Sequence, residues 1–328
     1  MKTLVVLLGF VTSIATAADF AVHFVDVGDG VKIEALDWGG RGTPVVLLAG
    51  SGNTGHVYED FAPKLADCCH VFAITRRGYG ASGKPQRGYS VPELAEDVWR
   101  VIGSLKIVKP VVVGHSMAGS ELSFLGQKHS NELAGLVYLD ANADPVDFPW
   151  SNDEYRALVM KSMKDGPPPP KRTEADNASV EAFRDFQKRT GGFPFPAGEI
   201  RAMYEIGANG VVGKNRTPPH VSQAIDAGSI PKDYRGITVP VLALFAVPKS
   251  PADKWKEQAP KSEQERADSD RIDTILLEFL HRWQGNLKRA VPSGRIVELP
   301  GGHHYLFQNE EEDVLREFRA FLRSIDQR

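Results

Sequence analysis

Residues 111–119 read Val111-Val112-Val113-Gly114-His115-Ser116-Met117-Ala118-Gly119, a serine between small residues directly after an apolar, β-branched run. A β-branched run favours a strand, and small residues let the backbone turn sharply after it. A serine on such a strand-to-helix turn projects its hydroxyl from the end of the strand. The helix that follows would bring the positive end of its dipole close to that hydroxyl. The stretch therefore predicts that Ser116 is a nucleophile.

The composition of the 328-residue chain is that of an ordinary globular protein, with 42% hydrophobic and 25% charged residues. The formal net charge is -3 and lysine and arginine form no long run, so the charge pattern argues against a nucleic-acid partner. The two cysteines, Cys68 and Cys69, are neighbours and cannot link distant parts of the fold. We also expect no metal site, since these two residues alone cannot build one for zinc.

The first 17 residues have the pattern of a secretory signal peptide. Lys2 supplies the positive charge, residues 4–11 are apolar, and Ala15-Thr16-Ala17 offers a small-x-small cleavage site. The apolar stretch is shorter than the roughly 20 residues needed to cross a bilayer, so a stable membrane anchor is not expected. We predict export to the periplasm or the extracellular space, with a mature chain that begins at Ala18.

Short apolar runs alternate with amphipathic stretches up to about residue 140 and again from about residue 237, which is the pattern of an α/β protein. Several of the apolar runs are continuous valine and leucine, as in a parallel sheet that is buried on both faces. The first two alternate, which indicates an antiparallel hairpin at one edge. The predicted strands are residues 21–27, 32–37, 45–48, 71–75, 110–113, 136–139, 239–245 and 295–298, and the predicted helices are residues 57–65, 91–105, 117–128, 270–290 and 311–325.

Residues 146–236 break this rhythm because they are rich in proline, aromatic and charged residues. We predict that they form a cap inserted between the sixth and seventh strands. The core then consists of residues 18–145 and 237–328. A second irregular run, residues 248–266, is predicted to be a solvated loop that leads into a helix.

A serine hydroxyl needs a base to take its proton, and the base needs a carboxylate to orient it. Two histidines occur in Pro300-Gly301-Gly302-His303-His304, between the last predicted strand and the last predicted helix. The two glycines would let this loop bend back over the sheet. The sequence therefore contains candidates for the base in the order that a serine hydrolase requires.

Four segments make the chain resemble the α/β-hydrolase fold family over nearly all of its length after residue 17. The resemblance implies a mostly parallel eight-stranded sheet flanked by helices, and a serine hydrolase that needs no cofactor. The segments are Val45-Val46-Leu47-Leu48-Ala49-Gly50-Ser51-Gly52, Ala73-Ile74-Thr75-Arg76-Arg77-Gly78-Tyr79-Gly80-Ala81-Ser82, the stretch around Ser116, and Pro300-Gly301-Gly302-His303-His304.

The resemblance also implies the catalytic base. The family's Pro-x-x-Gly-His spacing, counted from Pro300, reaches His304, although His303 stands where the family has glycine. We predict His304 as the base and keep His303 as the alternative. His115 occupies a position that the family often fills with histidine, and we assign it no chemistry.

The acid departs from the family's common pattern. The usual position after the seventh strand holds Lys249, and Asp253 comes late. Some members take the acid from the end of the sixth strand, where this chain has Asp140. We predict Asp140 as the acid, with Asp253 and then Asp144 as alternatives.

An acyl-transfer enzyme also needs donors for the oxyanion that develops on the carbonyl oxygen. The resemblance points to the backbone N–H groups of Ser51 and Met117. The oxyanion loop of related esterases often begins His-Gly, whereas this chain has Ala49-Gly50. Arg76 is expected to form a structural salt bridge beneath these loops.

The sequence thus predicts an exported serine hydrolase that cleaves a small-molecule carboxylic ester through an acyl-enzyme, without cofactor or metal. The alternatives are hydrolysis of a lactone, an amide or a carbon–carbon bond, cofactor-free haloperoxidase chemistry, or a non-catalytic ligand-binding protein. Epoxide and haloalkane hydrolysis fit less well, because relatives with that chemistry use an aspartate where this chain has Ser116. The substrate and the oligomeric state stay open.

Overall fold

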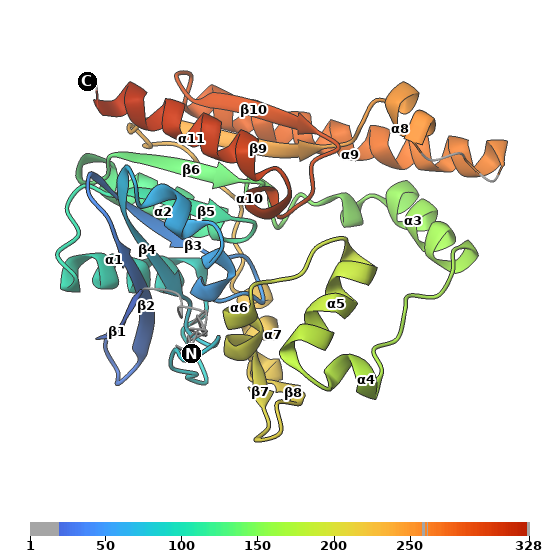
Figure 1. The fold of residues 1–328 in the computed structure, drawn as a ribbon. Coiled ribbons are helices and arrows are strands. Elements are labelled where there is room, and N and C mark those ends of the chain that lie inside the picture. The colour runs from blue at the N-terminus through green and yellow to red at the C-terminus, as the bar shows by residue number, and fades with distance from the viewer. Residues whose placement is uncertain (1–19, 258–259, 261, 327–328) are drawn as a thin grey trace, which may run out of the picture.

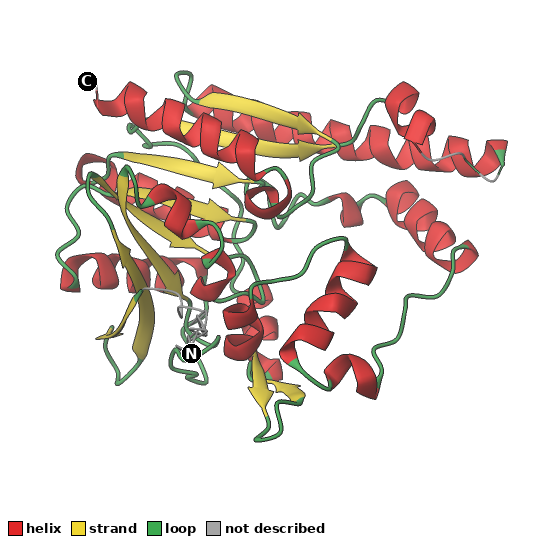
Figure 2. Ribbon diagram, in the orientation of Figure 1, coloured by secondary structure: helices red, strands yellow, loops and turns green. Residues whose placement is uncertain are grey.

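The computed structural model describes residues 20–257, 260 and 262–326, so the predicted signal peptide lies outside the described residues. Its centre is one sheet of eight strands with helices on both faces (Figures 1 and 2). The strand order is β1-β2-β4-β3-β5-β6-β9-β10; β1, β2 and β4 pair antiparallel, and the pairs from β4 to β10 are parallel. This confirms the predicted fold class and the antiparallel hairpin at the edge.

The elements of the core follow the predicted alternation of strands and helices. The strands are β1 (Ala21–Asp26), β2 (Lys32–Gly39), β3 (Thr43–Leu48), β4 (Cys69–Thr75), β5 (Val111–His115), β6 (Gly135–Leu139), β9 (Val241–Val247) and β10 (Arg295–Pro300). The helices are α1 (Val91–Ser104), α2 (Ala118–His129), α8 (Pro251–Glu257), α9 (Glu263–Ala290), α10 (Leu306–Asn309) and α11 (Glu311–Asp326), with 3-10 turns η1 (Gly55–Tyr58), η2 (Ala62–Leu65) and η3 (Ser130–Glu132).

The parallel strands bury both of their faces. On β3, Val46 and Leu48 pack in one apolar cluster with residues of α1, α2 and α9, while Val45 and Leu47 pack in a second cluster with residues of η1, η2 and α11. Successive side chains of a strand point to opposite faces, so both parities must be apolar. This is why these strands read as continuous apolar runs in the sequence.

Between β6 and β9 the chain leaves the sheet and forms the segment predicted as a cap, residues 146–236, which we call the cap (Figure 1). It has a small apolar cluster of its own, made by Val180, Phe183, Ile200 and Val212. Its elements are η4 (Pro149–Ser151), α3 (Asp153–Asp165), α4 (Glu174–Asn177), α5 (Val180–Gly191), α6 (Ala197–Met203), β7 (Tyr204–Ile206), β8 (Val212–Asn215) and α7 (Pro219–Ala227).

Two local predictions were wrong. The helix predicted for residues 57–65 is instead the two turns η1 and η2. A continuous helix would need an N–H at Pro63, which proline lacks. The run 248–266, predicted as a solvated loop, contains α8 and the start of α9, because the hydroxyls of Ser250 and Ser262 accept from backbone N–H groups in the first turns of these helices and cap them.

Among the described residues, no helix combines the length and the apolar composition needed to cross a bilayer. Within the same ranges, no group of three or more His, Cys, Asp or Glu side chains is arranged to hold a metal ion.

Candidate active site

Ser116 lies on the turn between β5 and α2, as the sequence predicted. Its φ is 55°, in the left-handed region that residues other than glycine rarely adopt. The turn is held by a hydrogen bond from the Ser116 N–H to the Leu139 carbonyl (3.2 Å) and by one from the Gly119 N–H to the Ser116 carbonyl (3.0 Å). Backbone strain of this kind is concentrated at functional sites.

Gly119 lies in the first turn of α2 and packs tightly against the chain that follows β6. A Cβ on Gly119 would lie 1.7 Å from the carbonyl oxygen of Ala141, in the segment that follows β6. The close contact between α2 and that segment therefore requires glycine at position 119.

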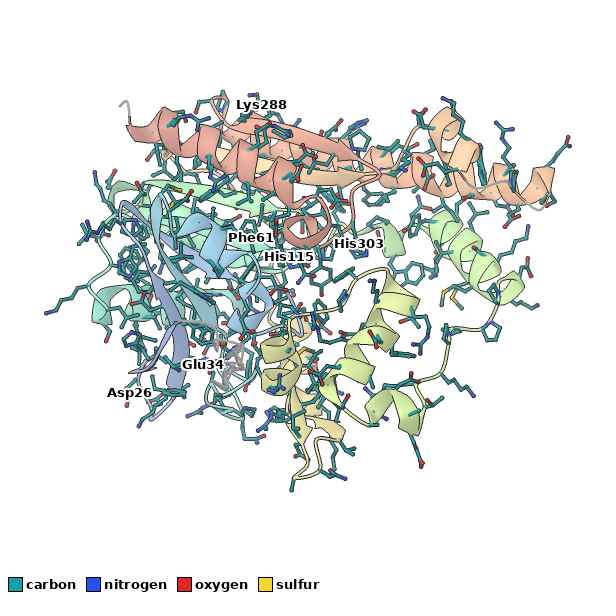
Figure 3. All side chains as sticks on the ribbon, in the orientation of Figure 1. Asp26, Glu34, Phe61, His115, Lys288 and His303 are labelled. Carbon is teal, nitrogen blue, oxygen red and sulfur yellow. The ribbon has the colours of Figure 1, made fainter. Side chains whose placement is uncertain are left out.

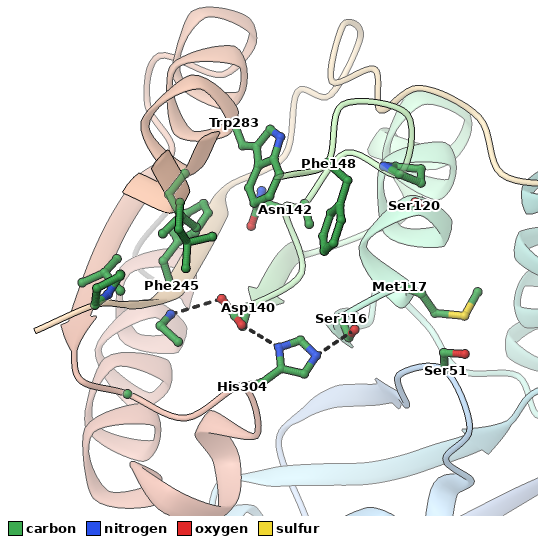
Figure 4. A pocket seen from close by; sticks show the side chains of 18 of the residues that line it. Ser51, Ser116, Met117, Ser120, Asp140, Asn142, Phe148, Phe245, Trp283 and His304 are labelled. Carbon is green, nitrogen blue, oxygen red and sulfur yellow. Dashed lines mark hydrogen bonds and ion pairs between the residues drawn. The ribbon is translucent and has the colours of Figure 1, made fainter. Parts of the chain in front are cut away.

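Ser116, His304 and Asp140 meet at the carboxyl end of the sheet (Figure 4). Nε2 of His304 lies 2.9 Å from Oγ of Ser116, and Nδ1 lies 2.6 Å from Oδ2 of Asp140. Because a carboxylate can only accept, Nδ1 carries the proton and Nε2 is free to accept one from the serine. An imidazole held in this way between a hydroxyl and a carboxylate can act as a general base.

Asp140 is fixed from two sides at the end of β6. Its φ of 45° is also in the left-handed region, and its N–H donates to the Leu244 carbonyl at 2.8 Å. Its Oδ1 accepts from the N–H of Ala246, on β9, at 3.1 Å. With Oδ1 held by the neighbouring strand, Oδ2 is the oxygen directed at His304.

The alternative acids are occupied elsewhere. Asp253 is exposed in the first turn of α8, where it accepts from Oγ of Ser250 (2.7 Å) and pairs with Lys256 (3.0 Å). Asp144 accepts from the backbone N–H groups of Val146 and Lys232.

The alternative base points toward the cap. The ring of His303 packs against Phe193 with 4.7 Å between ring centroids, and its Nδ1 accepts from the N–H of Tyr305 (3.1 Å). Figure 3 shows His303 in the space between α10 and the cap. Burial lowers the pKa of His303. It is thus the ring of His304 that lies within hydrogen-bond distance of Ser116.

His115 contacts the site in a way that the sequence did not indicate. Its Nε2 lies 2.9 Å from the carbonyl oxygen of His304. Burial, aided by the charge of nearby His304, lowers the pKa of His115 to about 3, so its ring is neutral and Nε2 donates to that carbonyl. His115 therefore holds the backbone of His304. No local pattern could have shown this contact, because it spans 189 positions.

Two backbone N–H groups beside Ser116 are available as oxyanion donors. Ser51 follows β3 and Met117 precedes the first residue of α2, and both line the same pocket as Ser116. Within the described ranges, neither N–H makes a hydrogen bond. Unpaired donors next to a nucleophile can stabilise negative charge that develops on a carbonyl oxygen.

Arg76 forms the salt bridge expected beneath these loops. It is buried, its Nε lies 2.5 Å from Oε1 of Glu121 on α2, and its Nη2 donates to the Ala49 carbonyl (2.9 Å). Burial acts to lower the pKa of Arg76, but Glu121 outweighs it and the pKa is raised. Arg76 ties the start of the oxyanion loop to the helix that carries the nucleophile turn.

A pocket of about 790 Å³ opens over Ser116 and His304. Its wall is largely apolar, and Figure 4 shows three of the aromatic side chains that contribute to it. Its large apolar side chains include Phe148, Ile225, Phe245, Leu276, Leu280 and Trp283.

The fold and the site together define a hydrolase of the α/β class. The chain belongs to the alpha/beta hydrolase family, whose sequence model matches residues 45–317.

Among the similar proteins, hydrolases match this chain along nearly their whole length. The 2-(acetamidomethylene)succinate hydrolase of Mesorhizobium japonicum is 24% identical over 315 residues, which are 93% of this chain and 98% of that protein. The bifunctional esterase/perhydrolase of Acinetobacter calcoaceticus is 24% identical over 312 residues, 92% of this chain and 99% of that protein. The crystal structure of the esterase RhEst1 from Rhodococcus sp. has a TM-score of 0.60 at 19% identity and covers 93% of this chain and 99% of its own.

Proposed function

We propose that the protein hydrolyses a carboxylic ester through an acyl-enzyme formed on Ser116. The observation that carries the proposal is the hydrogen-bonded series from Ser116 through His304 to Asp140. Labelling with a serine-directed fluorophosphonate, and its loss in Ser116→Ala, is the direct test.

In this mechanism Oγ of Ser116 attacks the ester carbonyl carbon while Nε2 of His304 takes the hydroxyl proton. The N–H groups of Ser51 and Met117 donate to the oxyanion of the tetrahedral intermediate. His304 then protonates the alcohol oxygen as the C–O bond breaks, which leaves the acyl group on Ser116. Water attacks the acyl carbon through the same base and releases the carboxylic acid. Asp140 keeps the imidazole in the required tautomer and stabilises its charged form.

The charges of the pocket argue against an anionic substrate, since Asp226 lines it together with two ion pairs. Lys249 pairs with Glu257 (Nζ to Oε2, 2.5 Å), and Lys254 pairs with Asp273. All four residues line the pocket, and no other lysine or arginine lines it within the described part of the chain. One relative is named for a succinate, a dicarboxylate. The cations of the present pocket are already neutralised, so we propose a neutral ester with an apolar acyl or alcohol group.

We expect kcat/KM to rise at least about tenfold from p-nitrophenyl acetate to the hexanoate, because each buried methylene contributes about 0.8 kcal/mol. The adipate monoester, which adds a carboxylate at the same chain length, should be slower by about 100-fold, because burial of an unpaired charge is costly. Leu276→Trp places a larger side chain in the apolar wall and narrows the pocket. It should lower activity on the hexanoate but not on the acetate. A preference for the charged ester would contradict this substrate class.

We also propose that the protein is exported and that residues 1–17 are removed; the support is the sequence pattern alone. N-terminal sequencing of protein from the periplasm or medium of the source organism should give Ala18 as the first residue. Recovery of the chain with Met1 from the cytoplasm would contradict export.

A further inference from the structure

A carboxylate of the cap is buried against the oxyanion loop. Glu199, on α6, has no solvent-exposed surface. Its Oε1 accepts from Nδ2 of Asn53 (2.8 Å) and from the N–H of Thr54 (3.0 Å), and its Oε2 accepts from Oγ1 of Thr54. The chemistry described above does not use this group, although its partners lie two and three residues after Ser51.

The Asn53 amide nitrogen and the Thr54 N–H can only donate, so Oε1 of Glu199 must accept. The Thr54 hydroxyl donates to Oε2, while it accepts from the His56 N–H (3.2 Å). The orientation of the Asn53 amide is also fixed. Its Oδ1 accepts from the Tyr305 hydroxyl at 2.8 Å, so its Nδ2 is the atom that faces Glu199. Burial raises the pKa of Glu199 to about 7, while the donors and the charge of His56 favour the anion. The amide of glutamine could accept the two Oε1 bonds through its oxygen, but it would turn its NH₂ group toward the N–H and the hydroxyl of Thr54, which both donate to Oε2.

The oxyanion loop is thereby held at both ends. Arg76 donates to the carbonyls of Ala49 and Gly50 from the core, and Glu199 accepts from the loop's far end. Ser51, whose N–H is unpaired within the described residues, lies between these two attachments. The orientation of that N–H therefore depends on both of them.

The approach of α6 to the core is unusually close. The N–H of Gly198 donates to Oε2 of Glu59 (3.2 Å), and a Cβ at Gly198 would lie 1.8 Å from Oε1 of the same residue. A Cβ at this position would force the Glu59 side chain to move, so glycine preserves the contact between α6 and Glu59.

We propose that Glu199 is a positioning residue for hydrolysis: from the cap, its carboxylate holds residues 51–54 so that the Ser51 N–H is aimed at the oxyanion. The inference rests on the proposed function, since it takes Ser51 as an oxyanion donor. It makes the cap a structural part of the catalytic site as well as a wall of the pocket. Through Asn53 and Tyr305, the same network reaches the residue next to His304.

The test compares Glu199→Gln with Glu59→Gln in the full mature protein. Glu59 ties the same helix to the core but touches neither Asn53 nor Thr54. We expect Glu199→Gln to lower kcat about 10- to 100-fold with KM within about twofold, since complete loss of an oxyanion donor costs about 100- to 1,000-fold. Glu59→Gln should keep kcat within about threefold of wild type, as for a change outside the site. Rates are normalised to sites titrated with fluorophosphonate, so that unfolded protein is not counted.

Inhibition by a trifluoromethyl ketone separates positioning from a purely structural role. This ketone forms an oxyanion adduct with the serine, so its Ki should rise by the same factor by which kcat/KM falls in Glu199→Gln. If Glu199→Gln does not fold, Thr54→Val removes one bond of the network, and Thr54→Ser, which keeps the hydroxyl, should restore the rate.

The outcomes distinguish the two proposals. A wild-type protein that neither labels nor turns over esters would remove the proposed function, and the role of Glu199 with it. An active wild type whose Glu199→Gln and Thr54→Val variants keep full kcat and unchanged ketone Ki would overturn only the role of Glu199. The role of Glu199 would also be overturned if the total rate of the variants fell while the rate per titrated site stayed at the wild-type value.

Discussion

Ser116→Ala is expected to lower kcat/KM for any turned-over ester by about 10⁴-fold or more and to abolish labelling by a fluorophosphonate. The variant lacks the only atom that can form the acyl-enzyme, while the base and the oxyanion donors stay in place. The fold should persist, because the backbone bonds of Ser116 to Leu139 and Gly119 do not involve its side chain. Stopped assays for turnover, labelling stoichiometry and circular dichroism measure the three effects.

Ser120→Ala is the matched control for this prediction. Ser120 lies one turn further along, in α2; it is buried and lines the same pocket, but among the described residues no hydrogen bond joins its hydroxyl to His304. We expect its labelling to be complete and its rate to stay within about threefold of wild type, as for a substitution away from the reacting atoms. Ser116→Ala protein that still labels at full stoichiometry would show that another residue is the nucleophile.

Much of this arrangement could be predicted, because it depends on short-range patterns. Ser116 and Asp140 each follow an apolar strand, and consecutive strands of an α/β sheet are usually neighbours with their carboxyl ends at the same edge. The sequence alone thus brings these two residues near each other. The sequence left alternatives for the histidine and the acid that act with Ser116, since the choice depends on how the loop after β10 folds back over the sheet. In the structure, His304 and Asp140 are in contact.

The contacts that the sequence did not indicate join distant segments without any motif. Glu199 lies 146 positions from Asn53, and a single glutamate in a proline-rich, charged segment has the pattern of a solvated residue. Its burial follows from the tertiary approach of α6 to the oxyanion loop, where Asn53 and Thr54 donate to its carboxylate. A charged segment is therefore a sign of solvation only where the fold brings no hydrogen-bond partner to its charged groups.

The choice of acid gives the second large effect. We expect Asp140→Asn to lower kcat by about 10³- to 10⁴-fold and Asp253→Asn to change it by less than about twofold. The Ala246 N–H should retain the carbonyl oxygen of the new amide, because it already holds Oδ1. The NH₂ group of the amide then faces Nδ1 of His304. Nδ1 must accept, Nε2 carries the proton, and the imidazole can no longer take a proton from Ser116.

This reasoning also predicts what Asp140→Asn should leave unchanged. Because the bond to Ala246 persists and the side chain keeps its size, the melting temperature should stay close to that of wild type, so the lost rate reports the tautomer and not unfolding. Asp144→Asn provides a further comparison, because the hydrogen bonds that the Asp144 carboxylate accepts within the described residues come from the backbone N–H groups of Val146 and Lys232 and not from His304. If kcat instead collapses in Asp253→Asn or Asp144→Asn while Asp140→Asn remains active, the acid lies outside β6 and the contact between His304 and Asp140 does not set the tautomer.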